Sequence, residues 1–402
     1  MMNNKKGWIV VLAGTGINLA FGVLYAWSIF AGQLQDSLGW SKTESSLPYT
    51  VAIVMFALMM IPAGKLQDKI GPRWVATIGG VLIGAGCILA GFLTSLWGLV
   101  FSFGVLAGSG IGLGYASTTP PAVKWFPPEK KGLITGIVVG GFGLASLYIV
   151  PLSKYLLAEF GVFTSFKILG VLFLCITVPL AQLVRNPETP AVSASATKKA
   201  AGVDLTYKDM LKTKEFYMLW FMFFAGATGG LMTIGGLKTI VKSLLGEGAA
   251  FQLVAFAAIA NALGRPMAGV ISEKIGRGKT MTLLYLLQAG ALFMFNSLTS
   301  FAPVFMAACM IYFAYGSMLS VFPSACGDNY GTKNLGLNYG ILFSAWGVGG
   351  FFGPMLGGRI ADATGSYELA FMIAAGILIV AAGVGFVIKP YQHKVNANQQ
   401  TA

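Results

Sequence analysis

The chain has 402 residues, of which 56% are hydrophobic and 10% are charged, and its mean hydropathy is +0.74. Because an ordinary soluble domain carries about 25% charged residues, this composition excludes a water-soluble globular fold. The formal net charge of +13 does not indicate nucleic-acid binding, since nearly all Lys and Arg lie in short loops between apolar runs.

Twelve apolar runs, each long enough to cross a bilayer as a helix, follow one another along the chain. They are unbroken rather than alternating, which excludes a transmembrane barrel. We therefore expect an all-α membrane protein whose twelve transmembrane helices form an N-terminal six-helix bundle (1–184), a cytoplasmic linker (185–214) and a C-terminal six-helix bundle with a tail (215–402). The expected spans are residues 8–32, 46–63, 74–94, 97–118, 133–153, 163–184, 215–237, 249–271, 280–298, 302–325, 338–358 and 367–388.

Basic residues are unequally divided between the two sides of these spans. One side carries the basic clusters of residues 64–73, 119–132, 272–279 and the linker. The loops of the other side hold only Lys42, Lys154, Lys238, Lys242 and Arg359. Since cytoplasmic loops are enriched in Lys and Arg, we expect a multi-pass protein of the cell inner membrane with both termini in the cytoplasm.

The two halves of the chain carry similar loops at nearly constant spacing. Residues 64–71 (GKLQDKIG) resemble 269–276 (GVISEKIG), and residues 131–137 (KGLITGI) resemble 335–341 (LGLNYGI). Both matches follow the equivalent span of each half in the same orientation, which indicates a parallel duplication. In such proteins two bundles related by a pseudo-two-fold axis enclose a site near the middle of the membrane.

These loops also carry a family resemblance. Residues 64–73 resemble the signature that the major facilitator superfamily carries between its second and third helices. A narrower resemblance, to the monocarboxylate transporters and the oxalate:formate exchangers, rests on residues 124–127 (KWFP) with Gly132 and Gly136, on 210–213 (MLKT), and on 264–266 (GRP). The chain resembles a bacterial member of the monocarboxylate transporter family. This resemblance implies the major facilitator fold and the transport of lactate-like acids with a proton.

Arg265 lies deep in the expected span 249–271, about four residues or roughly 6 Å past its middle. A cation at this depth destabilises insertion by about 2.5–3.5 kcal/mol, and the 14 Asp and Glu residues all fall in loops or near the ends of expected spans. A planar guanidinium binds a carboxylate through two parallel hydrogen bonds, so we expect Arg265 to bind the carboxylate of the substrate. The alternative is an arginine that pairs with helix C-terminal carbonyls or extends toward the cytoplasm.

Two positions depart from the families that the chain resembles. Asn261, one turn before Arg265 on the same helical face, stands where animal monocarboxylate transporters carry an aspartate. We expect Asn261 to bond the substrate or to orient the guanidinium, with an interhelical hydrogen bond as the alternative. Trp346 stands where oxalate:formate exchangers carry a lysine, so a second buried cation is missing. One cation suits a monoanion, which favours lactate or pyruvate over oxalate.

The resemblance implies that Tyr115, Tyr25 and either Tyr315 or Tyr312 complete the substrate site, because they lie on helices that face the cavity in this superfamily. Of these, Tyr115 and Tyr315 are expected first because they are the deepest. A phenol supplies both a hydrogen bond and an apolar wall, and Leu24 would contact a methyl group. Ordinary packing is the alternative for each of these side chains.

Five charged residues are expected to form cytoplasmic gates. They are Asp68, Lys69 and Arg73 in the first signature loop, and Glu273 and Arg277 in its second copy. By resemblance, Asp68 contacts a helix N-terminus of the opposite half, where the helix dipole favours an acid. The alternative is a set of loop charges that serves membrane topology alone.

We therefore expect a secondary transporter that moves a small monocarboxylate, lactate-like or pyruvate-like, with a proton by alternating access. The route of the proton stays open, since the sole histidine, His393, lies in the tail. A carboxylate anion exchanger of the oxalate:formate type and a membrane sensor without transport are the alternatives.

No enzyme activity, cofactor or metal site is expected, because the sequence carries no nucleophile–base pair and its four cysteines lack metal-ligand spacing. The expected partners are the acid anion, a proton and the lipid bilayer, and not nucleic acid. The oligomeric state stays open, and a monomer is sufficient for this function.

Overall fold

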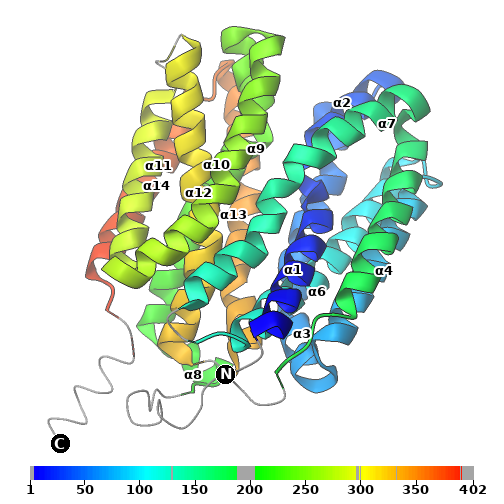
Figure 1. The fold of residues 1–402 in the computed structure, drawn as a ribbon. Helices are drawn as coiled ribbons and strands as arrows, with labels where there is room; N and C mark the ends of the chain where they lie inside the picture. Colours follow the sequence, from blue (N-terminus) through cyan, green and yellow to red (C-terminus); the bar gives the residue numbers. More distant parts are fainter. Residues whose placement is uncertain are drawn as a thin grey trace, which may run out of the picture. The chain divides into compact units, whose positions relative to one another are not determined.

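A computed structural model of the chain describes residues 4–127, 130–187, 204–295, 298, 300–331, 333–389 and 391. Throughout these residues the regular elements are helices, and a helix lies over each of the twelve expected spans (Figure 1). The expected all-α membrane fold is thereby confirmed. Residues 188–203 of the expected linker and the tail that contains His393 lie outside the described residues.

The first half of the chain contains two irregular helices. The first span is interrupted by a 3₁₀ turn, and the fourth span includes a π-helical segment. Spans five and six form one long element interrupted at Gly161, whose φ of 71° is accessible to glycine without a steric penalty. In chain order the elements are α1 (Asn4–Phe21), η1 (Gly22–Ala26), α2 (Trp27–Leu38), α3 (Lys42–Ile70), α4 (Pro72–Ala90), α5 (Leu96–Leu99), η2 (Val100–Ala107), α6 (Gly108–Lys124) and α7 (Lys131–Ala181).

The second half begins with a short helix of the linker and continues with six long helices. In the linker helix, the Thr206 hydroxyl and then Lys212 hold the pKa of Asp209 below its ordinary value. The elements are α8 (Tyr207–Met210), α9 (Lys214–Leu245), α10 (Glu247–Ile275), α11 (Arg277–Phe295), α12 (Phe301–Tyr330), α13 (Leu335–Thr364) and α14 (Glu368–Val387).

Several helices extend beyond the apolar runs from which they were predicted. The expected span 46–63 lies within α3, which begins four residues earlier and ends seven residues later. Its start is stabilised by a capping box, in which the Glu44 amide donates to Ser41 Oγ at 3.1 Å and the Ser41 amide donates to Glu44 Oε2 at 2.8 Å. Hydropathy marks only the lipid-embedded part of a helix, so polar ends stabilised by such caps are missed.

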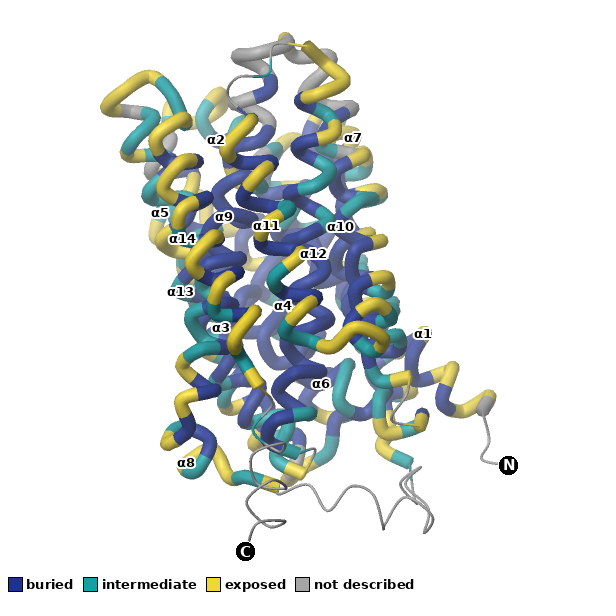
Figure 2. The backbone as a smooth tube through the Cα atoms, turned by 90° about the vertical axis from the view of Figure 1, so that its left-hand side faces the viewer, coloured by how far each residue is buried: buried dark blue, intermediate teal, exposed yellow. Residues whose placement is uncertain are grey.

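Large apolar side chains are exposed along the helices, as a bilayer environment requires. Figure 2 shows exposed residues recurring along α3 and α14 between buried ones. Phe386, Trp97 and Phe293 are each more than two-thirds exposed. Among the described residues, nine helices are long and apolar enough to cross a membrane, and one of them, α7, covers two expected spans. The chain is therefore a multi-pass membrane protein.

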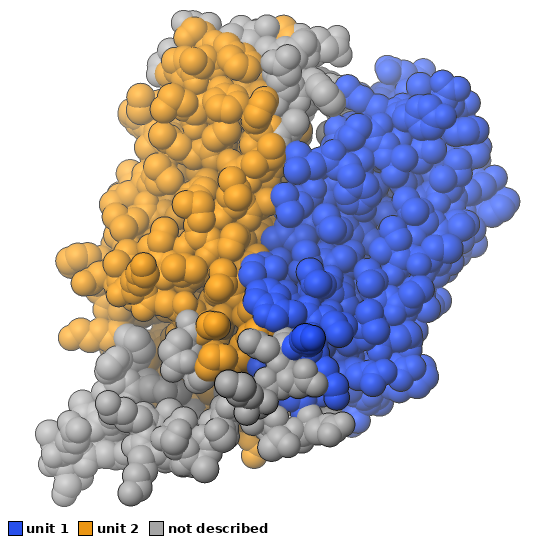
Figure 3. All heavy atoms as spheres, in the orientation of Figure 1, with its two compact units in different colours: residues 1–125, 137–188 blue, residues 126–136, 189–402 orange. Residues whose placement is uncertain are grey.

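The chain divides into two compact units (Figure 3). The first contains residues 1–125 and 137–188, and the second contains 126–136 and 189–402. In the first unit α6 packs against α1, α3 and α4, and in the second α10 packs against α12 and α9 against α13. The segment 126–136, which lies within the expected N-terminal bundle (1–184), belongs to the second unit.

Glycines explain why the segment 126–136 belongs to the second unit. A Cβ added to Gly132 would lie 2.7 Å from the carbonyl oxygen of Gly269, and one added to Gly136 would lie 2.7 Å from that of Arg265. Both distances are shorter than any ordinary carbon–oxygen contact. The start of α7 therefore contacts the backbone of α10 directly, which no larger residue would permit.

Candidate functional site

The centre of the candidate site is Arg265 in α10, whose side chain is fully buried at 0% exposure. Its Nε and Nη2 both donate to Asn261 Oδ1, at 3.2 and 3.0 Å. These contacts follow from the spacing of four residues, which places the two side chains on one face of the helix. Asn261 therefore orients one edge of the guanidinium.

The turn that carries Arg265 is held against α12 by two serine hydroxyls. Ser317 Oγ donates to the Gly264 carbonyl at 3.0 Å, and Ser320 Oγ donates to the Arg265 carbonyl at 2.6 Å. One residue before Ser317, Gly316 lies so close to Asn261 that an added Cβ would collide with the Asn261 carbonyl. Figure 1 shows α10 and α12 side by side. At lipid depth, such hydrogen bonds between helices position side chains that carry a charge.

Tyr315 lies on α12, one residue before Gly316, and is also buried. Its hydroxyl oxygen accepts a hydrogen bond of 2.9 Å from Nε1 of Trp346, which lies on α13. Three helices of the second unit thus bring Arg265, Asn261, Tyr315 and Trp346 to neighbouring turns of its interior.

Two of the other expected substrate residues, Tyr25 and Tyr115, contact Phe142 of α7 in the first unit. Tyr25 and Tyr115 both approach the Phe142 ring edge to face, with ring centroids at 5.3 and 5.7 Å. Tyr25 and Leu24 lie on η1, and a Cβ added to Gly22 would lie 2.7 Å from the Phe142 carbonyl. The absence of a side chain at Gly22 therefore lets η1 contact α7.

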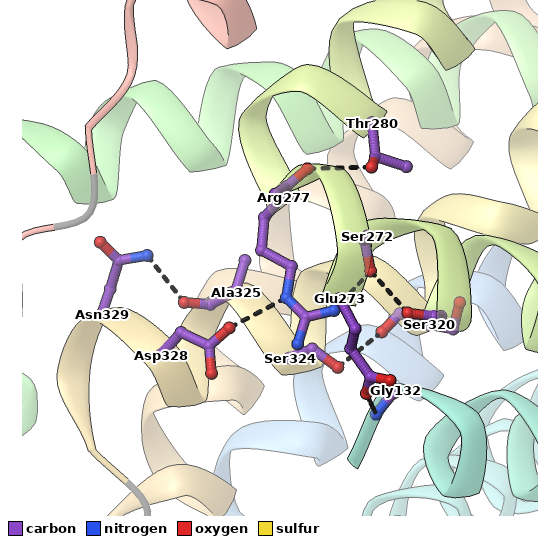
Figure 4. A network of polar contacts seen from close by, with 12 residues as sticks. Gly132, Ser272, Glu273, Arg277, Thr280, Ser320, Ser324, Ala325, Asp328 and Asn329 are labelled. Atoms are coloured by element: carbon purple, nitrogen blue, oxygen red, sulfur yellow. Dashed lines mark hydrogen bonds and ion pairs between the residues drawn. The ribbon is translucent and has the colours of Figure 1, made fainter. Parts of the chain in front are cut away.

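The second signature loop forms a connected polar network (Figure 4). Glu273 Oε1 accepts a hydrogen bond of 2.6 Å from the backbone N–H of Gly132. Arg277 forms an ion pair with Asp328, with Nε 2.9 Å from Oδ2, and it also donates to the Ser272 hydroxyl. The two expected gating residues of this loop are therefore engaged with α7 and α12, respectively.

In the first signature loop the expected gating residues are placed differently. Arg73 donates from Nε to Gln182 Oε1 at 2.6 Å, and its guanidinium lies over the Trp74 ring at 5.5 Å. Lys69 is exposed. The Asp68 side chain lies outside the described part, so its contact with a helix N-terminus stays a prediction.

A buried carboxyl is a feature that sequence reasoning missed. Glu215, in the first turn of α9, is 3% exposed. Its position at a helix end follows from the sequence, but its burial does not. Among the described charged residues, only Arg265 and Glu215 are almost fully buried.

Other residues missed from the sequence support the side chains that were expected. Phe142 holds the two tyrosines of the first unit, and Ser317 and Ser320 hold the Arg265 turn. Two serines three residues apart in an apolar run are a signal for hydrogen bonds to a neighbouring helix. Phe142 gives no comparable signal, because phenylalanine is common in every span. No cluster of His, Cys, Asp or Glu suited to a metal ion occurs in the described ranges.

Comparisons with known proteins agree with this architecture. A family model described as Major Facilitator Superfamily matches residues 10–313 and 248–402. The oxalate:formate antiporter of Oxalobacter formigenes is 31% identical over 391 residues, which are 96% of this chain and 92% of that protein. Monocarboxylate transporter 13 of Bos taurus is 26% identical over 383 residues, which are 94% of this chain and 88% of that protein.

The crystal structure of the transporter FucP in its outward conformation has the same fold, with a TM-score of 0.69 at 14% identity. The superposition covers 95% of this chain and 99% of the FucP chain. With the family model matching most of its length, the chain belongs to the Major Facilitator Superfamily.

Proposed function

We propose that the protein is a secondary transporter that moves a small monocarboxylate, of the size of lactate or pyruvate, with a proton across the cytoplasmic membrane by alternating access. The observation that carries this proposal is the fully buried Arg265, oriented by Asn261 in the interior of the second unit. Burial of a guanidinium at membrane depth is unfavourable, so such a residue generally serves binding or transport.

The chemistry of the arginine favours a carboxylate. Its planar fork matches the two oxygens of a carboxylate and forms stronger hydrogen bonds than neutral donors do. Two relatives support this substrate class, because their names are oxalate:formate antiporter and monocarboxylate transporter. Both names denote carriers of small carboxylic acids.

The charge of the site favours a monoanion. Arg265 is the one almost fully buried cation among the described residues, and the buried Glu215 lies in the first turn of α9. Binding of one carboxylate therefore neutralises one buried positive charge, which lowers the barrier to rearrangement of the loaded carrier. A dianion would leave one negative charge uncompensated.

A second candidate, exchange of carboxylate anions, is favoured by the 31% identity to the oxalate:formate antiporter. The two functions differ in what drives uptake into proteoliposomes. A proton-coupled carrier accumulates its substrate in response to an imposed inward proton gradient. An exchanger requires an internal counter-anion and does not respond to the proton gradient.

The role of Arg265 is tested with Arg265→Lys and Arg265→Ala and a panel of formate, acetate, lactate, pyruvate and oxalate. We expect Arg265→Ala to lose at least about 30-fold in uptake efficiency, because removing a buried charged partner costs about 2–5 kcal/mol. Arg265→Lys should lose about tenfold, since lysine keeps the charge without the fork. Unchanged half-saturation in Arg265→Ala would place the carboxylate elsewhere.

A further inference from the structure

The side chain of Trp346 is buried in the second unit and bonded to a residue of the proposed substrate site. Trp346 is 3% exposed, and its Nε1 lies 2.9 Å from the Tyr315 hydroxyl oxygen. An indole N–H is a donor only, so the tyrosine oxygen must be the acceptor in this contact. The hydroxyl proton of Tyr315 is therefore directed away from Trp346.

Both rings are held in place by close packing. The Trp346 ring stacks on Phe343 with centroids 4.9 Å apart and planes 27° apart, and Phe343 in turn contacts Phe223 edge to face at 5.7 Å. On the other side, the Tyr315 ring packs so closely on Gly230 of α9 that an added Cβ would collide with it. The hydrogen bond therefore joins two rings whose orientations are set by their surroundings.

Tyr315 is also fixed in depth relative to Arg265. The next residue, Gly316, packs on the backbone of Asn261, and Ser317 Oγ bonds to the Gly264 carbonyl at 3.0 Å. Residues 315–317 of α12 therefore lie level with the turn of α10 that carries the arginine. A ligand held by the guanidinium would lie at the level of the tyrosine.

We propose that Trp346 is a positioning residue, which turns the Tyr315 hydroxyl so that its proton is donated to the acid bound by Arg265. This inference rests on the proposed function, because it assumes that Arg265 binds a carboxylate. A hydroxyl that accepts from an N–H becomes a stronger donor, since hydrogen bonds in a chain polarise one another. Trp346 thereby adds affinity for a carboxylate without adding a second positive charge to the site.

The test is a double-mutant cycle with Trp346→Phe, Tyr315→Phe and the double variant, all in proteoliposomes. The probe is the acid of the panel above with the lowest half-saturation concentration. Each single variant should raise that concentration about 3- to 10-fold, as expected for the loss of one buried hydrogen bond. The double variant should be no weaker than Tyr315→Phe alone, because Trp346 acts through Tyr315.

A matched control is Trp220→Phe. Trp220 on α9 also donates its indole N–H across to α13, to Ser344 Oγ at 3.0 Å. The Trp220→Phe substitution removes the same type of hydrogen bond between helices and should leave the half-saturation concentration unchanged. An equal increase in Trp220→Phe and Trp346→Phe would mean that both tryptophans act by general packing, which overturns the proposal.

Additive effects of Trp346→Phe and Tyr315→Phe, or no effect of Trp346→Phe, would also overturn it. Failure of the proposed function is a separate result, because it would appear as an unchanged half-saturation concentration in Arg265→Ala. If Trp346→Phe does not yield folded protein, Trp346→His replaces it, with and without Tyr315→Phe. We then expect the effect of histidine on half-saturation to vanish in the Tyr315→Phe background, and its persistence there would contradict the inference.

Discussion

The backbone N–H of Gly132 donates a hydrogen bond of 2.6 Å to Oε1 of Glu273. Gly132 is the second residue of α7, and its amide is one of the four that a helix leaves without an intrahelical acceptor at its start. The carboxylate also lies where the helix dipole favours negative charge. The contact therefore holds the start of α7 against α10 by both a hydrogen bond and a charge.

Replacement of Glu273 by Gln should weaken this contact without removing its oxygen acceptor. The charge contributes about 1 kcal/mol at a helix N-terminus, so the open form of the contact should become about fivefold more populated. Hydrogen exchange of the amides in residues 130–136, followed by mass spectrometry, should accelerate by this factor. Lys274→Gln, at the exposed neighbouring position, is the control and should leave the exchange unchanged. Equal exchange in Glu273→Gln and wild type would show that the carboxylate does not hold the helix start.

Gly132→Ala should separate the same two helices by steric overlap. The added Cβ would lie 2.7 Å from both Glu273 Oε1 and the Gly269 carbonyl oxygen, and the latter belongs to backbone that has little freedom to move. Overpacking of this type costs about 1–3 kcal/mol, so the Tm of the purified protein should fall by several degrees.

The control for this variant is Gly290→Ala in α11, where an added Cβ meets nothing within 4 Å. Alanine is a better helix former than glycine, so this variant should keep or raise the Tm. A Tm of Gly132→Ala at or above that of wild type would show that the interface adjusts without strain.

The positions of the helices could be predicted from the sequence because lipid depth requires an unbroken apolar run. The capped ends of α3 could not, since Ser41 and Glu44 are polar residues outside that run. Similarly, the repeated signature loop predicted a gating role for Glu273 and Arg277. It did not predict that the partner of Glu273 is a backbone amide. A backbone partner leaves no trace in residue type.

The part of the candidate site that could be predicted consists of residue types that are rare at lipid depth. Arg265 and Asn261 stand out because charged and amide side chains seldom occur within a span. Phe142 and Trp346 could not be recognised as partners of tyrosines, because aromatic residues occur throughout the spans and their pairing depends on helix rotation. The burial of Glu215 likewise depends on packing between helices rather than on its own neighbours in sequence.

Asn261→Asp should place a carboxylate beside Arg265 and thereby form an ion pair within α10. Asn261 Oδ1 already accepts from Nε and Nη2 of Arg265, so a carboxylate oxygen at the same place would bind the guanidinium more strongly. The introduced charge would compete with the substrate carboxylate. We expect the half-saturation concentration for a monocarboxylate at neutral pH to rise at least about tenfold, measured as uptake into proteoliposomes.

Asn261→Ser separates charge from the loss of the amide, since serine is neutral and too short to replace both contacts. Its effect should be smaller than that of Asn261→Asp. If the two variants have the same half-saturation concentration, orientation of the guanidinium rather than its charge balance determines affinity.

Phe142→Leu tests whether the tyrosines of the first unit serve the substrate or only pack. Phe142 contacts Tyr25 and Tyr115 edge to face at 5.3 and 5.7 Å, and each such contact contributes about 0.5–1.5 kcal/mol beyond burial. Leucine keeps an apolar side chain but cannot supply the aromatic face, so both phenols should lose their fixed orientation. If they contact the substrate, the half-saturation concentration should rise about 3- to 10-fold, together with a lower Tm. Phe101→Leu, at a position 53% exposed on η2, should change neither quantity. A lower Tm of Phe142→Leu with unchanged half-saturation would mean that Tyr25 and Tyr115 stabilise the helices and leave recognition of the acid to the second unit.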